Sequence, residues 1–596
     1  MVFVLACAVY LQTVSYGFAG DDLEIIRDRV LFHDLSRWRE ILAASWWPNA
    51  LYRPVTALTL AVNWVAGSGD PRMFHAVNVL LHGVASVLVY WLAAGCMPRR
   101  AAVIAGLLFA VHPVHVEAVV NLVGRAEVLS TVFALAGVLL YRYDGALADG
   151  GDHRSWRRIA ASFGALLATV LALGSKESAF ALPGLVLLVD WYDGQTTGRS
   201  LGDSVRRHSL LWMAVLVTAL GWLVLRARIV GDLTGVEVAP GLEGQGMFGR
   251  ALVMLPIVVH YARLLLVPAR LSVEYSPEFV QVPAAVTAMG LAGVAILALT
   301  AGVAVAARRR APVVTLGIGW IGMAVLIVAN ILVPTGILLA ERTLYLASVG
   351  VVLLLAWLAQ WALRRAPSAA MACLALVVGA GALRVVTRNP IWRDDTTYFP
   401  AMVQDAPGSF RALWTAAELA RQQGDFRRSE FLLRRAIQAH PLAWAVWQDL
   451  GKLLYVEGRY RESAECFWAA WRITGGGAWL AQRAIHASLR AGQVDAADSM
   501  LTQARQARPA MPAELMLAAS DVALARGQYL RAMTWRRRVA WEYPDSARYW
   551  ALTGQAALAA RHCAEVRHSI ARLRPLPGAG QSLRELEAAA PAQGCK

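Results

Sequence analysis

Two adjacent carboxylates, Asp21 and Asp22, directly follow the first apolar run of the chain, in the stretch GFAGDD. One carboxyl group of so close a pair is expected to have a raised pKa, because two like charges at short range oppose ionisation. One member can then accept a proton while the other orients a reacting group. The pair therefore predicts proton-transfer chemistry at the edge of an apolar region.

Other charged residues occur in short polar motifs between apolar runs, and four of the cations in these motifs are candidate site residues. These motifs are LYRPVTALTLAVNW (51–64), NLVGRAEV (121–128), GSKES (174–178), PTGILLAERTLYL (334–346) and RNPIWRDD (388–395), and the cations are Arg53, Arg125, Lys176 and Arg342. Ionisable residues at membrane depth are costly and usually functional. Charges that gather at one face predict a single site there, although each cation could instead contact a lipid headgroup or pair with Glu127, Glu177 or Glu341.

The elements that position these residues are apolar segments long enough to cross a bilayer. The chain of 596 residues is 57% hydrophobic, with a mean hydropathy of +0.47. This composition excludes a disordered chain and argues against a purely soluble protein. Apolar runs of about 17–25 residues recur up to about Val386, and none follows Arg388, which predicts a membrane domain and then a second domain.

The formal net charge of +16 is explained by short basic loops rather than by nucleic-acid binding, because such loops orient membrane helices. The loops MPRR (97–100), HRSWRR (153–158), VRRH (205–208), ARRRA (307–311) and LRRA (363–366) are placed in the cytoplasm. About eleven spans then alternate between the two sides. They are 1–19, 75–96, 101–120, 126–142, 157–174, 178–191, 209–226, 284–306, 312–333, 344–362 and 368–387.

The apolar segment at about 250–267 would place ARRRA on the outside if it crossed the membrane, so we expect it to be interfacial or re-entrant. The first run lacks a basic leader and a clean cleavage site, which favours an uncleaved anchor over a signal peptide. With this arrangement Asp21, Asp22 and the other polar motifs lie outside the cytoplasm.

The second domain repeats with a period of about 34 residues, in segments that start near 410, 444, 478, 513 and 547. The second segment has the tetratricopeptide pattern at Trp447, Leu450, Gly451, Leu454, Gly458, Tyr460, Phe467 and Ala470. Stacked repeats of this kind form a curved solenoid, which binds a peptide or serves as a spacer or oligomerisation element. The six cysteines show no metal-ligand spacing; Cys563 and Cys595 could form a disulfide or stay as free thiols.

The order of the motifs resembles the transmembrane and tetratricopeptide-repeat O-mannosyltransferases and their bacterial relatives. The resemblance rests on DDLEII, LYRPVTALTLAVNW, FHAVNVLLHGVASVLVY, AVHPVHVEAVVNLVGRAEVLS, SKESAFALPGLVLLVDW, ERTLYLASVG and RNPIWRDD, followed by the repeats. It implies an all-α protein with a GT-C glycosyltransferase membrane bundle and a tetratricopeptide-repeat solenoid. We expect the glycosyltransferase domain at 1–390, a linker at 391–409, the repeats at 410–580 and a tail at 581–596.

The resemblance also implies an enzyme that uses a polyprenyl-phosphate sugar as donor. Asp21 or Asp22 would be the catalytic base, and Glu117 or Glu127 a second acidic residue. Arg53, Arg125, Lys176 and Arg342 would bind the donor phosphate, because Arg suits bidentate phosphate contact and Lys acts as a point charge.

The motif HPVHVE places His112 and His115 three residues apart, with Glu117 nearby. Three interpretations remain: a metal site, a polar wall of the donor cavity, or a structural hydrogen bond. Pro113 disturbs the helix that would put the two histidines on one face, so a divalent metal is not indicated, although it stays possible, and no other cofactor is expected.

The leading hypothesis is a multi-pass enzyme of the bacterial inner membrane that transfers a sugar, with mannose as one candidate, to a hydroxyl group of an extracytoplasmic protein. The repeats, on the same side, would bind the protein or peptide acceptor. A non-catalytic membrane scaffold for envelope assembly is the alternative. A transporter would show broken helices with charges near mid-bilayer, which the pattern does not favour.

Overall fold

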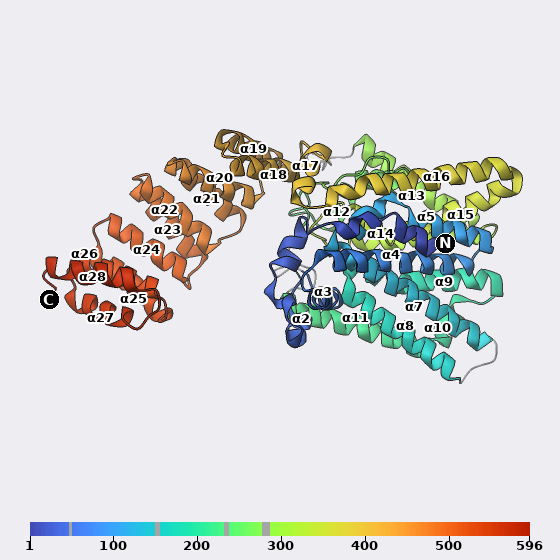
Figure 1. Ribbon diagram of the computed structural model, residues 1–596, viewed down its shortest axis with the longest axis horizontal. Helices are drawn as coiled ribbons and strands as arrows, with labels where there is room; N and C mark the ends of the chain where they lie inside the picture. Colours follow the sequence, from blue (N-terminus) through green and yellow to red (C-terminus); the bar gives the residue numbers. More distant parts are fainter. Residues whose placement is uncertain (47–50, 150–154, 232–237, 277–286, 596) are drawn as a thin grey trace. The chain divides into compact units, whose positions relative to one another are not determined.

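The computed structural model describes residues 1–46, 51–149, 155–231, 238–276 and 287–595. Within these ranges every element is helical, and the chain divides into two compact units, Met1–Ala412 and Leu413–Lys596 (Figure 1). This agrees with the expected all-α class. The first unit has a bundle of long apolar helices, and the second is an array of helix pairs.

The described part of the first unit contains seventeen α-helices, most of which lie in the bundle. They are α1 (Val2–Ala8), α2 (Trp38–Ala43), α3 (Pro54–Gly67), α4 (Pro71–Ala94), α5 (Arg99–Ala110), α6 (Val116–Val120), α7 (Arg125–Asp149), α8 (Trp156–Ser175), α9 (Leu182–Thr197), α10 (Leu201–Arg207), α11 (Ser209–Val230), α12 (Met247–Leu266), α13 (Ala288–Ala307), α14 (Pro312–Val328), α15 (Ser348–Arg365), α16 (Pro367–Arg388) and α17 (Asp395–Asp405). Each expected span after the first coincides with one of these helices or with the bent pair α5–α6.

Among the residues that the structure describes, seven helical segments are long and apolar enough to cross a membrane, or eight if the pair α5–α6, bent by 47°, counts as one span. This is fewer than the expected eleven, partly because α9 and α14 have 16 and 17 residues. The expected first span, 1–19, is also not one helix. It consists of α1 and the 3₁₀ helix η1 (Leu11–Ser15).

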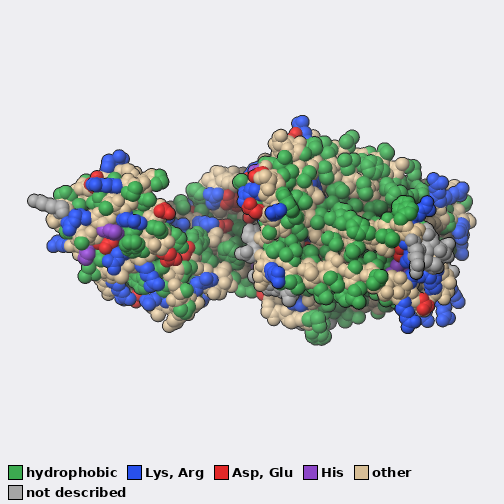
Figure 2. Space-filling model, turned by 90° about the horizontal axis from the view of Figure 1, so that it is seen from below, with side chains coloured by type: hydrophobic (Ala, Val, Ile, Leu, Met, Phe, Trp, Pro, Cys, Tyr) green, Lys and Arg blue, Asp and Glu red, His purple; other side chains and the backbone are tan. Residues whose placement is uncertain are grey.

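The five basic loops meet at one end of the bundle, which we call the basic end. Three of them line a common cavity with Pro98, Arg310 and Arg364. The other two are joined by Asp144 on α7, which contacts Arg158 at 3.1 Å and His208 at 3.0 Å. Two residues earlier on α7, Arg142 donates to the carbonyl oxygen of Gly95 at 2.9 Å, which ties both groups of loops together. Figure 2 shows blue Lys and Arg side chains gathered at one end of a broad hydrophobic surface.

Helix α12 meets the length and hydropathy criteria for a span, but hydrogen bonds near its two termini both lie at the opposite end of the bundle. Near its start, Arg250 donates to the carbonyl oxygen of Ile331, beyond the end of α14. At its other terminus the carbonyl oxygen of Leu265 contacts His112, beyond the end of α5. Both α5 and α14 begin at the basic end, so α12 starts and finishes at the far end. These contacts support an interfacial helix.

The second unit stacks helices in antiparallel pairs, as the 34-residue period predicts. The pairs are α18 (Phe410–Gln422) with α19 (Phe426–Ala439), α20 (Trp444–Val456) with α21 (Tyr460–Ile473), α22 (Ala478–Arg490) with α23 (Val494–Ala507), α24 (Ala513–Ala525) with α25 (Tyr529–Glu542) and α26 (Ala547–Ala559) with α27 (Cys563–Leu573), followed by α28 (Gly580–Ala592). A glycine with positive φ follows the first helix of four pairs, at 424, 458, 492 and 527. The Phe467 ring packs directly against Gly451, and a Cβ atom at that position would lie only 3.2 Å from the ring. Small residues therefore set the helix spacing within a pair.

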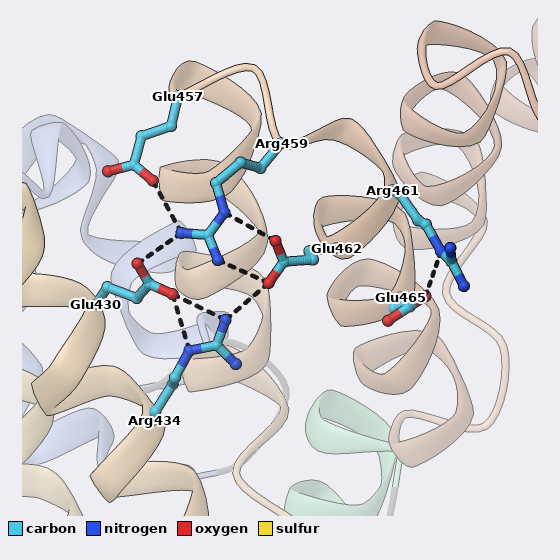
Figure 3. A network of polar contacts seen from close by, with 7 residues as sticks. All are labelled: Glu430, Arg434, Glu457, Arg459, Arg461, Glu462 and Glu465. Carbon is cyan, nitrogen blue, oxygen red and sulfur yellow. Dashed lines mark hydrogen bonds and ion pairs between the residues drawn. The ribbon is translucent and has the colours of Figure 1, made fainter.

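An ion-pair network joins neighbouring pairs of the array (Figure 3). Arg459 contacts Glu430 and Glu462, both at 2.7 Å, and Arg434 contacts the same two carboxylates at 2.8 and 2.9 Å. Each exposed pair contributes about 0.2–1 kcal/mol. The network thus adds modest stability to the junction of α19 and α21.

Two segments outside the expected domains are also helical. Segment 391–409, expected as a linker, contains α17 and belongs to the first unit. The expected tail, 581–596, begins within α28, and Cys595 forms a disulfide with Cys563 across a Cα–Cα distance of 4.9 Å. The disulfide ties the end of the described chain to α27.

Candidate functional site

The GFAGDD stretch is held in place by α17, at the end of the bundle opposite the basic end. Gly20 has φ +56°, and a Cβ there would lie 3.0 Å from the Tyr398 ring. Its N–H donates to Asp395 at 2.8 Å. Because few L-residues adopt this backbone conformation and Tyr398 leaves no space, the turn requires glycine. The turn presents the two aspartates in different environments.

Asp22 is buried, and its carboxylate accepts three backbone hydrogen bonds. Val123 donates at 3.0 Å, and Leu122 and Ala19 each donate at 3.4 Å. Burial raises its pKa to about 7, against the opposing effect of these three N–H donors. Asp22 therefore fastens its loop to the 3₁₀ helix η6 (Leu122–Gly124), which is a structural role.

Asp21 is exposed, and no hydrogen bond from a described residue reaches its carboxylate. It is near enough to Arg342 and Tyr398 to affect both electrostatically. Burial opposes the charge of Arg342, but the carboxylates of Glu117, Asp21 and Glu127 together raise the pKa of its guanidinium. Burial, and then the negative charge of Asp21, raises the pKa of Tyr398. Of the two aspartates, Asp21 has the accessible carboxylate.

Glu117 on α6 fixes Arg342 at the start of the 3₁₀ helix η8 (Glu341–Leu344). The Arg342 guanidinium contacts Glu117 Oε1 at 2.8 Å, and the Arg342 backbone N–H donates to Glu117 Oε2 at 2.9 Å. The Arg342 side chain is 22% exposed, while that of Glu117 is 7% exposed. Since a guanidinium has five N–H donors and one bonds Glu117, Arg342 keeps donors for a ligand.

Lys176, directly after α8, pairs with buried Glu127 on α7. Burial, with a smaller contribution from Arg53 and Arg342, lowers the pKa of Lys176 to about 8, against the opposing effect of Glu127. Lys176 thus lies within electrostatic range of two other cations. Arg53, Lys176 and Arg342 form one positive cluster, called here the cation cluster.

Arg53 reaches the cluster from the start of α3. It contacts Glu177 at 3.0 Å. Arg226, near the end of α11, contacts the other oxygen of Glu177 at 3.2 Å. Arg226 was not among the predicted site residues, because it lies inside an apolar run and no polar motif surrounds it. The Glu177 side chain is 25% exposed, and the two arginines together outweigh the effect of desolvation and hold the pKa of its carboxyl below the ordinary value.

Arg125 is completely buried, which differs from the expected role as a phosphate ligand. Its guanidinium donates to Asn78 at 2.7 Å, to the Phe74 carbonyl at 2.9 Å, to the Thr59 carbonyl at 3.3 Å and to Asn63. All three guanidinium nitrogens are therefore engaged with α3 and α4. The geometry gives Arg125 a structural role, which the spacing of the motif could not reveal.

The two histidines are also packed inside the fold. His112 Nε2 contacts the Leu265 carbonyl at 3.0 Å, and His115 Nε2 contacts the Ser348 hydroxyl at 2.8 Å. His115 is completely buried among Phe109, Tyr345 and His112. This favours the structural hydrogen-bond interpretation over a cavity wall. In the part of the chain that the structure describes, no group of three or more His, Cys, Asp or Glu could hold a metal.

Glu341 is a further acidic residue near the site, and the sequence suggested it only as an ion-pair partner of a cation. Glu341 Oε1 accepts from the Tyr275 hydroxyl and from the Ser272 N–H, both at 2.6 Å. Burial, and then the charge of Glu117, raises the pKa of Glu341 to about 8. The ERTLYL motif pointed to this position, but only the fold brings Ser272 and Tyr275 to it.

No protein-family model matches the chain. Among curated proteins it is 23% identical over 506 residues to human Protein O-mannosyl-transferase TMTC3, covering 78% of this chain and 54% of that protein. It is 25% identical over 531 residues to Protein O-mannosyl-transferase Tmtc1 of Drosophila melanogaster, covering 73% and 61%. The corresponding values for TMTC4 of Mus musculus are 28% over 426 residues, with 63% and 56% covered. The chain thus spans about half the length of the curated relatives it matches.

Solved structures give looser matches. The pilF protein of Pseudomonas aeruginosa matches 32% of this chain and 87% of its own, with 16% identity and a TM-score of 0.27. Yeast Tom70 matches 79% of this chain and 93% of its own, with 11% identity and a TM-score of 0.27.

Proposed function

We propose that this chain, a relative of the protein O-mannosyl-transferases, is an integral-membrane glycosyltransferase whose reaction takes place at the Asp21 end of the bundle. The donor in this proposal is a polyprenyl-phosphate sugar, and mannose is the sugar that the relatives' names suggest. The acceptor is a hydroxyl group of a protein or peptide. Lipid-linked donors suit a site at the end of a bundle of apolar helices.

The observation that carries the proposal is an accessible carboxylate beside the partly exposed Arg342 and the buried Lys176. Asp21 is exposed and makes no hydrogen bond with a described residue, and it raises the pKa of Arg342. Arg342 in turn lowers the pKa of Lys176. A base and a phosphate-binding cation are the two groups that sugar transfer from a lipid phosphate requires.

Each group then has a defined task. Asp21 accepts the proton of the acceptor hydroxyl as its oxygen attacks the anomeric carbon. The bond from that carbon to the phosphate oxygen breaks, and the guanidinium of Arg342 and the ammonium of Lys176 stabilise the phosphate that leaves. Glu117 and Glu127 hold these two cations in position. Arg53 completes the cation cluster.

The same proposal places the repeats on the Asp21 side of the membrane, where they bind the acceptor. Support comes from α17, the last helix wholly within the first unit. It contacts the GFAGDD loop through Asp395. If the basic loops are cytoplasmic, this side is extracytoplasmic. We further propose that transfer needs no metal ion, because Arg342 and Lys176 supply the positive charge.

A reconstituted transfer assay tests the proposal. The full chain in proteoliposomes receives acceptor peptides rich in Ser and Thr, with either polyprenyl-phosphate mannose or a nucleotide-linked mannose, and with or without EDTA. We expect transfer from the lipid-linked sugar alone, unchanged by EDTA. Transfer from the nucleotide sugar would contradict the donor assignment. No transfer from a range of lipid-linked sugars would favour the non-catalytic scaffold, which the names of the relatives do not favour.

A further inference from the structure

A polar cavity of roughly 270 Å³ lies at the basic end of the bundle, at the terminus of α4 opposite the Asp21 site. It is lined by Cys96, Met97, Pro98, Tyr192, Arg310, Ala311, Pro312, Val313, Trp357, Gln360, Trp361 and Arg364. None of these residues is acidic. Since α4 has 24 residues, it spans about 36 Å. The cavity is therefore separate from the proposed site of sugar transfer.

Two arginines give the cavity its charge. Arg310 follows α13, and Arg364 lies near the end of α15. Neither forms an ion pair with a carboxylate among the described residues, whereas Arg142 nearby is already paired with Asp193 at 2.7 Å. Both arginines are exposed, so their guanidinium N–H groups are free to donate to one bound anion. The cavity thus favours an anionic ligand.

The neutral lining adds a hydrogen-bonding group at the same place. Gln360 Oε1 is buried and has no hydrogen-bond partner among the described residues. Rotation of the amide exchanges its oxygen and nitrogen, so that Gln360 can donate to an anion. Helix α14 also begins at the cavity, with Pro312 as its first residue and no side-chain cap at its N-terminus. Its partial positive charge adds to that of the arginines.

The level of the cavity along the helices indicates where the anion comes from. It lies where α4, α13 and α15 end, and Trp357 and Trp361 are part of its wall. Arg365 covers the Trp361 ring at 4.1 Å. Tryptophan and arginine gather in this way at the headgroup level of a membrane. A phosphate group at this level belongs to a lipid of the surrounding leaflet.

We propose that this cavity binds the phosphate of an anionic phospholipid in the leaflet opposite the Asp21 site. Arg310 and Arg364 contact the phosphate oxygens, Gln360 donates to one of them, and the tryptophans pack against the glycerol region. Arginine suits this role because its planar N–H donors match a phosphate group bidentately.

Native mass spectrometry of the detergent-purified full chain tests the proposal. The ligands are phosphatidylglycerol, diacylglycerol with the same acyl chains, and inorganic phosphate. The variant is Arg310→Gln with Arg364→Gln, and the matched control is Arg308→Gln with Arg309→Gln. The control removes the same charge from exposed positions that do not line the cavity.

We expect the parent chain to retain phosphatidylglycerol and not diacylglycerol, and the cavity variant to bind it at least about 10-fold more weakly, the usual effect of losing a charged hydrogen bond. The control should bind it as the parent does, and all three chains should melt at similar temperatures. An equal loss in both variants would overturn the proposal in favour of general charge attraction. If diacylglycerol bound as tightly as phosphatidylglycerol, the phosphate group would not be what the cavity recognises, and the proposal would be wrong. If inorganic phosphate bound as tightly as phosphatidylglycerol, the cavity would be a site for free phosphate and not for a lipid.

Discussion

Substituting each aspartate of the adjacent pair separately should affect two different properties of the protein. Asp21→Asn removes an exposed carboxylate that makes no hydrogen bond with a described residue. Its effect on the free energy of unfolding should be within about 0.5 kcal/mol. If Asp21 is the base, transfer should fall by about 10²- to 10⁴-fold. This corresponds to about 2.7–5.5 kcal/mol of transition-state stabilisation.

Asp22→Asn should act on stability instead. At pH 8, above the pKa of about 7 given to Asp22 by burial, the carboxylate accepts N–H bonds from Val123 on one oxygen and from Leu122 and Ala19 on the other. An amide keeps the first bond and turns an NH₂ group toward the other two donors. The expected cost is about 1–3 kcal/mol in the free energy of unfolding.

The assay measures initial rates of mannose transfer in proteoliposomes and thermal unfolding by tryptophan fluorescence, both at pH 8. Glu24→Gln is the matched control, because Glu24 is exposed in the short π-helix Leu23–Arg27 directly after the pair and should change neither property. The reasoning is refuted if Asp21→Asn keeps full activity. It is refuted equally if Asp22→Asn abolishes transfer while melting like the parent, since Asp22 would then be the base.

Three further predictions concern the residues around the pair. Arg342→Gln and Lys176→Gln should each weaken use of the lipid-phosphate donor by about 10- to 150-fold, with little change in acceptor affinity. Kinetics in which donor and acceptor concentrations are varied independently measure the two effects. A change in acceptor affinity alone would disprove the phosphate role. Arg125→Gln should lower the free energy of unfolding by about 3–5 kcal/mol, since it leaves buried acceptors on α3 and α4 without their donor, and near-parental melting would contradict its structural role. Burial raises the pKa of Glu341 from 4.5 to about 8, so the folded state binds the proton more tightly than the unfolded state does. The contribution of this proton to stability is fully present below pH 4.5 and is lost as the pH rises to 8. The free energy of unfolding should fall over this window by up to about 1.4 kcal/mol per pH unit. Glu341→Gln keeps an acceptor for Tyr275 and Ser272 and should flatten that pH dependence in thermal unfolding; an unchanged slope would show that another group is responsible.

The sequence by itself determined the features that depend on local pattern. Apolar runs bounded by arginine loops predicted the membrane helices, because the length of a helix and the charge of its flanks are local properties. The five basic loops do meet at one end. The period of about 34 residues predicted the helix pairs of the second unit, because each repeat buries its apolar face only against its neighbours. The motifs also pointed to Asp21, Lys176 and Arg342.

The tertiary structure decided which charged residues are accessible. Nothing in the letters DD separates Asp21 from Asp22; the difference arises because the backbone of η6, about 100 residues later, donates to Asp22 alone. In the sequence, Arg125 and Arg342 are equivalent candidates for the phosphate-binding role. In the fold, Asn78 and Asn63 from other helices bind the Arg125 guanidinium. Helix α12 has the composition of a span, but its partners lie at one end of the bundle. In each case the role of a residue depends on groups that are remote in sequence, and only the packed fold brings those groups together.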